Sequence, residues 1–231
     1  GFPELWVHSS QFSALISPRR GGAIEVLTRF SDLTNLADVL TRRREFYHEP
    51  PKQHGHQHGE QSGGTASIHD IEKAAKLKEL PPVDIEPRAI LVERLIAGDL
   101  APASYARAQY KPLRSWAAVA MRSTVTQSGN DLTILLQGDG LEKKLEFDSA
   151  GCVHVSYAWD PSGLGTNAMF APELSVSRSI PIHAHPDAEI WRSEITTVAR
   201  SERGFEETVQ GFSITPRWPA HLGSARLELG P

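Results

Sequence analysis

Short apolar runs that alternate with polar residues, each followed by a turn signal, recur along most of this chain. The alternation is clean in residues 152–157, where Val153, Val155 and Tyr157 are separated by His154 and Ser156. Successive side chains of a strand point to opposite faces, so a period of two predicts strands with one buried face. In the second half of the chain, the pattern predicts strands at 116–126, 132–136, 141–147, 153–159, 190–199, 205–214 and 225–229.

Turn sequences separate these runs. Ser128-Gly129-Asn130-Asp131 and Gly138-Asp139-Gly140 consist of residues that favour tight turns. A further block of β pattern covers residues 4–30, and its Ser17-Pro18-Arg19-Arg20-Gly21-Gly22 stretch predicts a hairpin turn. Strands at a spacing of about 8–12 residues predict an all-β fold, an antiparallel sandwich or barrel. Of these we expect a large antiparallel β-sandwich. A parallel α/β fold is disfavoured because amphipathic helices do not alternate with the strands.

Two stretches depart from the β pattern. The spacing of Leu36, Val39 and Leu40 is helix-like, and a short helix is expected at 68–80, capped by Ser67 and ended by Pro81-Pro82. Between them, residues 50–64 are polar and rich in Gly, Gln and His, so they cannot contribute to a core. We therefore expect one β-sandwich domain over 1–231, with a flexible His/Gly-rich insert at 50–64 that is dispensable for folding.

The insert contains three alternating histidines, His54, His56 and His58. Alternating histidines on a strand can bind zinc or nickel. This stretch is Gly-rich, however, and no Asp, Cys or further His follows at tight spacing. We expect a solvated loop that binds metal adventitiously at most, and no cofactor.

Charge and hydropathy exclude several protein classes. The chain has 24 Lys and Arg against 28 Asp and Glu, a net charge of −4, so it lacks the basic character that nucleic-acid binding requires. No apolar run approaches the roughly 18–20 residues of a membrane span. The single cysteine, Cys152, excludes an intrachain disulfide and fits the cytoplasm. Because the chain begins at Gly1 rather than Met, we expect it to be a segment of a longer protein.

Motifs for catalysis are missing. The sequence has no Gly-x-Ser-x-Gly, no phosphate-binding Gly-rich loop and no dinucleotide fingerprint, and no pair of carboxylates stands out as a glycosidase pair. His183 and His185 alternate in Pro181–Pro186, where loop histidines are expected. A general acid–base role for them would need a buried carboxylate partner.

Aromatic side chains offer a second kind of candidate site. The flat ring of a tryptophan can stack on the apolar face of a sugar, although large aromatics in a sandwich more often pack in the core or at its rim. Trp159 and Trp191 are the candidates for sugar stacking. The other tryptophans are Trp6, Trp116 and Trp218.

Charged residues are crowded where the chain leaves the first β block. Arg42, Arg43, Glu45 and His48 lie within seven positions, beside Tyr47. They predict either a salt-bridged surface turn or a buried polar network that fixes this excursion against the sandwich.

A series of motifs in the first 70 residues resembles a known family. In order, they are Ile16-Ser17-Pro18, Gly21-Gly22-Ala23-Ile24-Glu25, Asn35, Leu40-Thr41-Arg42-Arg43, Glu45, Tyr47-His48 and Ser67-Ile68-His69-Asp70. This order resembles the C-terminal β-sandwich region of family 57 glycoside hydrolases, the α-amylases and 4-α-glucanotransferases, which vary between the last two motifs. Weaker similarity covers Glu142–Leu145 and Phe170–Glu173. At Pro81-Pro82-Val83-Asp84 the chain departs from the family's Tyr-Asp, with Val83 in place of Tyr, while Arg88 keeps a basic position.

The resemblance implies a galactose-mutarotase-like sandwich whose catalytic residues lie elsewhere, in an N-terminal barrel. It implies an accessory domain that packs against this barrel and contacts α-glucan. It also favours the network interpretation, with Arg42, Arg43, Glu45, His48 and His69 as a structural and interdomain cluster and Glu45 buried against an arginine.

Two other functions remain open. One is a free-standing mutarotase-like epimerase that uses His154, His183 or His185 with Glu173, although the sequence has no Asn-His or Gly-His element followed by Phe-Asn-Leu, as such enzymes have. The other is an interaction module without affinity for sugar.

Overall fold

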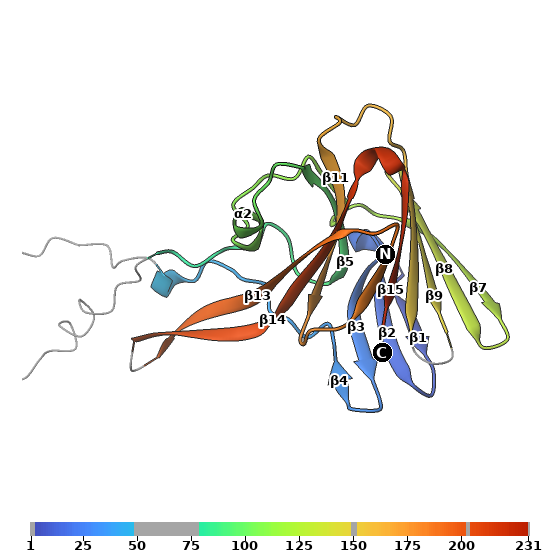
Figure 1. Ribbon diagram of the computed structural model, residues 1–231. Coiled ribbons are helices and arrows are strands. Elements are labelled where there is room, and N and C mark those ends of the chain that lie inside the picture. The colour runs from blue at the N-terminus through green and yellow to red at the C-terminus, as the bar shows by residue number, and fades with distance from the viewer. Residues whose placement is uncertain (1–2, 49–78, 149–151, 202–203, 231) are drawn as a thin grey trace, which may run out of the picture.

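Two antiparallel sheets pack face to face (Figure 1). The computed structural model describes residues 3–48, 79–148, 152–201 and 204–230. The large sheet has the order β1 (Leu5–His8), β2 (Phe12–Ser17), β3 (Ala23–Arg29), β5 (Ile90–Ala97), β11 (Ala168–Val176), β14 (Gly204–Pro219) and β13 (Glu189–Ser201), with β4 (Thr34–Asn35) beside β3 and β6 (Arg114–Ser115) beside β5. The small sheet has the order β12 (Ile182–His185), β15 (Ser224–Leu229), β10 (Val153–Trp159), β9 (Leu141–Phe147), β8 (Asp131–Gly138) and β7 (Arg122–Ser128). This confirms the expected all-β antiparallel sandwich.

Alternating side chains of the two sheets form the core between them. Phe170 on β11 lies at its centre, where its ring stacks on Trp159 of the opposite sheet at 4.1 Å between centroids. Strands β9 and β10 alternate buried and partly exposed residues, as their sequence predicts. The sequence pattern therefore places the inner face of the small sheet correctly.

Strand β5 has no alternation because both of its faces are covered. Its residues Ile-Leu-Val-Glu-Arg-Leu-Ile are all buried. The inner face contacts the core, and the outer face lies beneath the segment 79–115, which includes the short helix α2 (Pro102–Ala106) (Figure 1). A doubly covered strand lacks the period of two, so the pattern analysis missed it.

Tight turns join neighbouring strands as the sequence predicts. The Ser17–Gly22 turn contains the 3-10 helix η1 (Pro18–Arg20), followed by Gly21 and Gly22 at φ values of 64° and 69°. A Cβ on Gly21 would lie 2.4 Å from the Trp116 carbonyl oxygen, so this position requires glycine. The β8–β9 hairpin turns through Asp139 and Gly140, also at positive φ.

Two expected elements are corrected. The run 116–126 is not one strand, because residues 116–121 form a turn in which the Val119 N–H donates to the Trp116 carbonyl before β7 begins. The helix expected around Leu36 is also wrong. The Leu36 N–H donates to the Leu27 carbonyl on β3, and the Leu36 carbonyl accepts from the Ser177 N–H, so Leu36 bonds to other parts of the chain rather than within a helical turn.

Several expectations fall on residues outside the described ranges. These are the insert 50–64, most of the helix at 68–80, and the four histidines His54, His56, His58 and His69.

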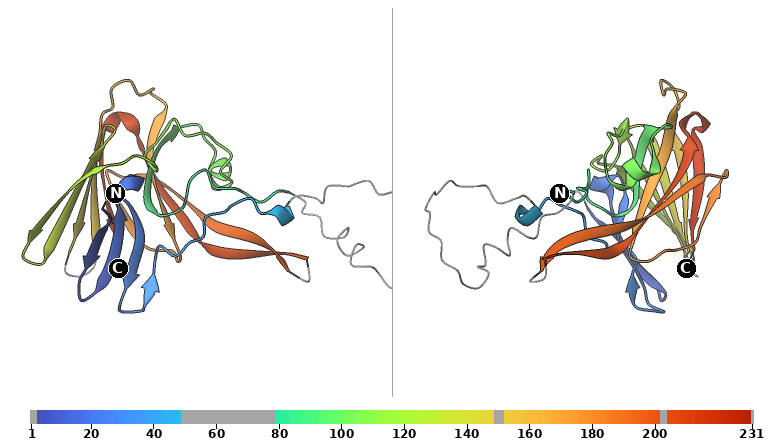
Figure 2. Two further views of the ribbon diagram at one scale, coloured as in Figure 1. Left: turned by 180° about the vertical axis from the view of Figure 1, so that it is seen from behind. Right: turned by 60° about the vertical axis from the view of Figure 1, so that its left-hand side comes forward.

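Strands β13 and β14 continue beyond the sandwich as a two-stranded ribbon (Figure 2). Strand β14 pairs with β11 only from Phe212 to Pro219, so its first half pairs with β13 alone. The 3-10 helix η2 (Phe46–His48) lies close to this ribbon, because His48 contacts Val198 of β13. A third 3-10 helix, η3 (Ala220–Leu222), links β14 to β15.

Candidate functional site

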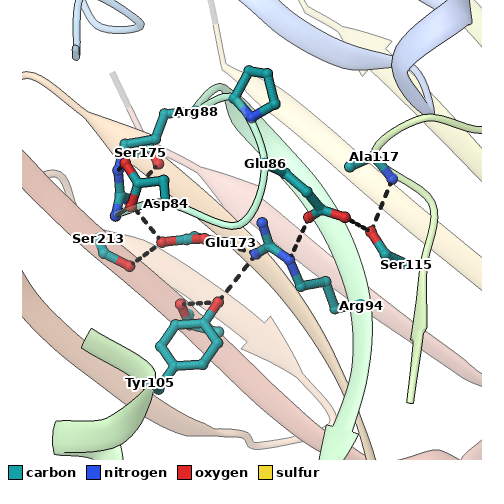
Figure 3. A network of polar contacts seen from close by, with 12 residues as sticks. Asp84, Glu86, Arg88, Arg94, Tyr105, Ser115, Ala117, Glu173, Ser175 and Ser213 are labelled. Atoms are coloured by element: carbon teal, nitrogen blue, oxygen red, sulfur yellow. Dashed lines mark hydrogen bonds and ion pairs between the residues drawn. The ribbon is translucent and has the colours of Figure 1, made fainter. Parts of the chain in front are cut away.

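Charged side chains form a network on the outer face of the large sheet, beneath α2 (Figure 3). We call it the arginine network; its members are Arg42, Asp84, Glu86, Arg88, Arg94 and Glu173. Three cations meet three carboxylates, so the charges balance. Removing such groups from water costs several kcal/mol per ion unless they are paired and hydrogen-bonded, as these are.

Asp84 joins the first two arginines. Its carboxylate accepts from Arg42 Nη2 at 2.7 Å and from Arg88 Nη2 at 2.6 Å, and the backbone N–H of Arg42 donates to it at 2.7 Å. Arg88 Nε donates to its second oxygen at 2.8 Å. Asp84 thereby fixes the segment 41–48 to the chain that leads into β5.

Glu173 on β11 joins the other two arginines. Its oxygens accept from Arg88 at 3.0 Å and from Arg94 at 2.7 Å, and Ser213 on β14 donates a third bond at 2.6 Å. Burial alone would raise the pKa of the Glu173 carboxyl, but the two guanidinium groups outweigh it and hold the pKa at about 2. Glu173 is therefore ionised throughout the neutral range and is no general acid.

Two tyrosines from the α2 segment cover the network. Burial raises the pKa of Tyr105 well above its ordinary value and that of Tyr110 to about 12. Both phenols keep their protons and act as hydrogen-bond partners; the Tyr105 hydroxyl lies 3.4 Å from Arg94 Nη1. The enclosed space is about 20 Å³, enough for a water molecule but not for a sugar. The arginine network thus links strands β5 and β11 to the segments that contain Arg42 and Asp84.

A second ion pair crosses the core between the sheets. Lys143 on β9 is 0% exposed, and its Nζ donates to both oxygens of Glu93 on β5, at 2.8 and 2.9 Å. The same ammonium donates to the carbonyls of Gly22 and Leu91, and the Tyr157 hydroxyl donates to Glu93. Burial raises the pKa of Glu93 and lowers that of Lys143, while each partner opposes the shift of the other. The pair therefore joins the two sheets inside the core.

Sequence reasoning missed most of these residues, although β5 carries a signal for them. Glu93 and Arg94 interrupt an apolar run, and because neighbouring strand residues face opposite ways, each needs a partner on its own side. Glu93 faces the core and Lys143, while Arg94 faces outward to Glu173. The resemblance to the family at Asp84 and Arg88 was a second signal in the sequence for these residues.

The Arg42–His48 cluster is only partly buried. Arg42 and His48 are buried, whereas Arg43 and Glu45 are exposed, and Glu45 forms no ion pair with any described residue. The expectation of Glu45 buried against an arginine is wrong, because Asp84 takes that place. His48 accepts from the Glu45 N–H through Nδ1 and donates through Nε2 to the Val198 carbonyl at 3.0 Å.

Replacing Glu45 by alanine should therefore lower the free energy of unfolding by less than about 1 kcal/mol, the usual range for an exposed charge. Arg42→Ala, which leaves Asp84 with one arginine fewer, should cost several times more. Urea unfolding of both variants is the measurement. Equal losses would show that Glu45 does support the network.

The two proposed sugar-stacking tryptophans are buried, and that expectation is corrected. Trp159 stacks on Phe170 and donates its indole N–H to the Ala220 carbonyl. Trp191 carries the Arg217 guanidinium over its ring at 3.8 Å and contacts Tyr105. Both rings are committed to packing within the domain.

The histidines of the epimerase hypothesis lie on the outer face of the small sheet. His183 and His185 are on strand β12 rather than in a loop, and His154 is on β10. In the register, His183 and His154 flank Glu228 on β15. Glu173 belongs to the arginine network on the other sheet, so it cannot act with them.

The described residues contain no group of three or more His, Cys, Asp or Glu side chains placed to hold a metal. They also contain no helix that is long and apolar enough to cross a membrane.

Comparisons with known proteins identify relatives of this sandwich. A family model described as "Alpha-amylase/4-alpha-glucanotransferase, C-terminal" matches residues 1–180 and 175–229. A 4-α-glucanotransferase of Thermococcus kodakarensis is 25% identical over 263 residues, which cover 99% of this chain and 39% of that protein. An α-amylase of Pyrococcus furiosus is 23% identical over 239 residues, 92% of this chain and 35% of that protein.

A solved structure has the same fold. The crystal structure of the 4-α-glucanotransferase from Thermococcus litoralis matches with a TM-score of 0.70 at 21% identity, covering 98% of this chain and 37% of that one. The chain therefore spans about two fifths of the length of the relatives it matches.

Proposed function

We propose, because this chain belongs to the family of α-amylase/4-α-glucanotransferase C-terminal domains, that it is a non-catalytic accessory domain of an α-glucan-acting hydrolase or transferase. The observation that carries the proposal is the match of the C-terminal family model to nearly the whole chain. The relatives are more than twice as long, which leaves the greater part of each for a catalytic domain.

The chemistry of the arginine network supports a non-catalytic role. A glycosidase needs two carboxyl groups about 5–9.5 Å apart across an open cleft, one of which keeps a raised pKa to act as the acid. Glu173 has a lowered pKa, and both Glu173 and Asp84 are held by arginines around a space for one water. These carboxylates serve to fix strands and loops.

The ribbon that leaves the sandwich is suited to docking on a catalytic domain. We call residues 196–201 and 204–210 the arm. Its two strands pair with each other and with no third strand of the described residues, and such a hairpin is marginal in water without a packing partner. Register places Val198, Phe205 and Val209 on one face together with Thr196, Arg200 and Glu207, and Thr197, Ala199, Thr208 and Glu206 on the other. Each face of the arm therefore carries both uncharged and charged side chains.

The motif around Arg42 braces this arm. His48 bonds to Val198 in the arm, and Arg42, six residues earlier, is anchored to Asp84 in the arginine network. The exposed side chain of Phe46 lies between these two anchors in sequence. We infer that the motif is structural and that, with the arm, it forms the surface that meets the catalytic domain.

The proposal predicts that the purified 231-residue chain converts no maltoheptaose, because the catalytic groups belong to another part of the parent protein. Product analysis should show neither hydrolysis nor transfer above a buffer blank. The complete gene product, assayed in parallel, should convert it. Turnover by the 231-residue chain, or a gene product that ends close to this chain's boundaries, would contradict the proposal.

A further inference from the structure

We propose that a cleft on the open side of the sandwich binds a neutral oligosaccharide, an α-glucan chain. The cleft lies between β1 at the edge of the large sheet and the β7–β8 hairpin at the edge of the small sheet. Its volume is about 590 Å³, within the range of small-molecule sites. The choice of α-glucan as the ligand rests on the proposed function; the location and the sugar chemistry rest on the lining.

Trp6 on the β1 rim is the first element of the site. Its side chain is 58% exposed, whereas the other four tryptophans of the chain are buried. The His8 ring lies parallel to it at 5.5 Å, and His8 Nδ1 is held at 3.0 Å from the Ser13 hydroxyl. Both side chains lie on the face of β1 opposite the buried Val7, so the two parallel rings stand on the outer rim of the cleft. A large apolar surface left in water beside a cleft is typical of a binding site.

The polar lining selects the class of ligand. Ser10, Gln127 and Asn130 are exposed and provide hydroxyl and amide groups, which can donate and accept hydrogen bonds as sugar hydroxyls do. Glu4 and Asp148 add carboxylate acceptors. Among the described residues the lining contains no lysine or arginine, so it offers no lysine or arginine cation to a phosphate or another anion.

The floor of the cleft suits the rest of a sugar. Leu5, Phe12 and Leu132 form an apolar base beneath the polar rim. A pyranose has C–H groups on its faces and hydroxyls around its edge, so this arrangement matches both parts. A fully polar or anionic ligand would leave the apolar base unused.

Isothermal titration calorimetry of the 231-residue chain with maltoheptaose tests the site. We expect saturable binding with a Kd of about 0.1–1 mM, as befits a shallow, partly solvated cleft. Trp6→Ala should weaken it roughly tenfold through lost ring contact, while Trp6→Phe should retain part of the affinity. Phe46→Ala, which removes an aromatic that is 86% exposed outside the cleft, is the matched control and should bind as the unmodified chain does.

A second variant and a second ligand sharpen the test. Gln127→Ala on the facing hairpin should also weaken binding, and it leaves β1 untouched. Cellohexaose, a β-linked glucan of the same monomer, should bind more weakly than maltohexaose. Iodide quenching of tryptophan fluorescence should fall on binding, because Trp6 is the exposed tryptophan.

Three results would overturn the assignment: no saturable heat with maltoheptaose, equal affinity in the Trp6→Ala and unmodified chains, or equal affinity for cellohexaose and maltohexaose. These outcomes are separate from the fate of the proposed function. If the complete gene product converts maltoheptaose but the 231-residue chain binds none, the binding site in the cleft is rejected and the proposed accessory role still stands.

Discussion

Replacing Glu173 by alanine is expected to lower the free energy of unfolding by about 3–5 kcal/mol, the range measured when one partner of a buried ion pair is removed. The variant leaves Arg88 and Arg94 without the carboxylate that joins them, and Ser213 loses its acceptor. Urea unfolding followed by circular dichroism is the measurement. Glu206→Ala, at an exposed carboxylate on β14, is the matched control and should change stability by less than about 1 kcal/mol.

The pH dependence gives an independent check of the same group. The pKa of the Glu173 carboxyl is lowered to about 2 from its ordinary value of 4.5, so the folded protein stabilises the ionised form relative to the unfolded chain. Its contribution is present above the unfolded pKa and is lost as the pH falls from about 4.5 toward 2. The unmodified chain should lose stability over that interval more steeply than Glu173→Ala. Two results would contradict the network: the same pH dependence of stability in both chains, or a decrease in the free energy of unfolding of less than about 1 kcal/mol on Glu173→Ala at pH 7.

Lys143→Met should be similarly costly, by about 3–5 kcal/mol, because it leaves the Glu93 carboxylate unpaired in the centre of the core. Replacing both members, as Lys143→Met with Glu93→Leu, should recover part of that loss, since apolar pairs of similar volume often substitute for buried ion pairs. The Gly22 and Leu91 carbonyls lose a donor in both variants, which limits the recovery.

The double-mutant cycle in urea isolates the pair. We expect the double variant to be more stable than the sum of the single losses predicts, by at least about 1 kcal/mol. Strictly additive losses would show that Lys143 and Glu93 do not interact.

Local pattern was sufficient to predict much of the fold. Strands β9 and β10 expose one face to solvent, so their sequence alternates, and the turns between strands carry glycine where positive φ requires it. Strand β5 could not be found in this way, because it lies under the α2 segment on one side and over the core on the other. Its two charged residues have no local explanation; their partners lie on β9 and β11.

The candidate site was harder to predict than the fold. Arg42 was rightly singled out, but its carboxylate is Asp84, 42 residues later, rather than the nearby Glu45. Nothing in a sequence distinguishes a charge that reaches a distant partner from one that faces solvent. For the same reason composition alone could not separate Trp6 at the surface from Trp159 and Trp191 in the interior, since exposure depends on which strands are neighbours.

The central claim is that this chain is an accessory domain that docks on a larger catalytic partner through the arm and the adjoining segment 42–48. Hydrogen–deuterium exchange of the complete gene product, compared with the 231-residue chain alone, tests it most directly. We expect the arm amides to exchange at least about tenfold more slowly in the complete protein, because docking suppresses their local opening. The β9 and β10 amides, paired on both sides within the sandwich, serve as the internal control and should exchange equally in both. Identical exchange of the arm in the two proteins would contradict the account.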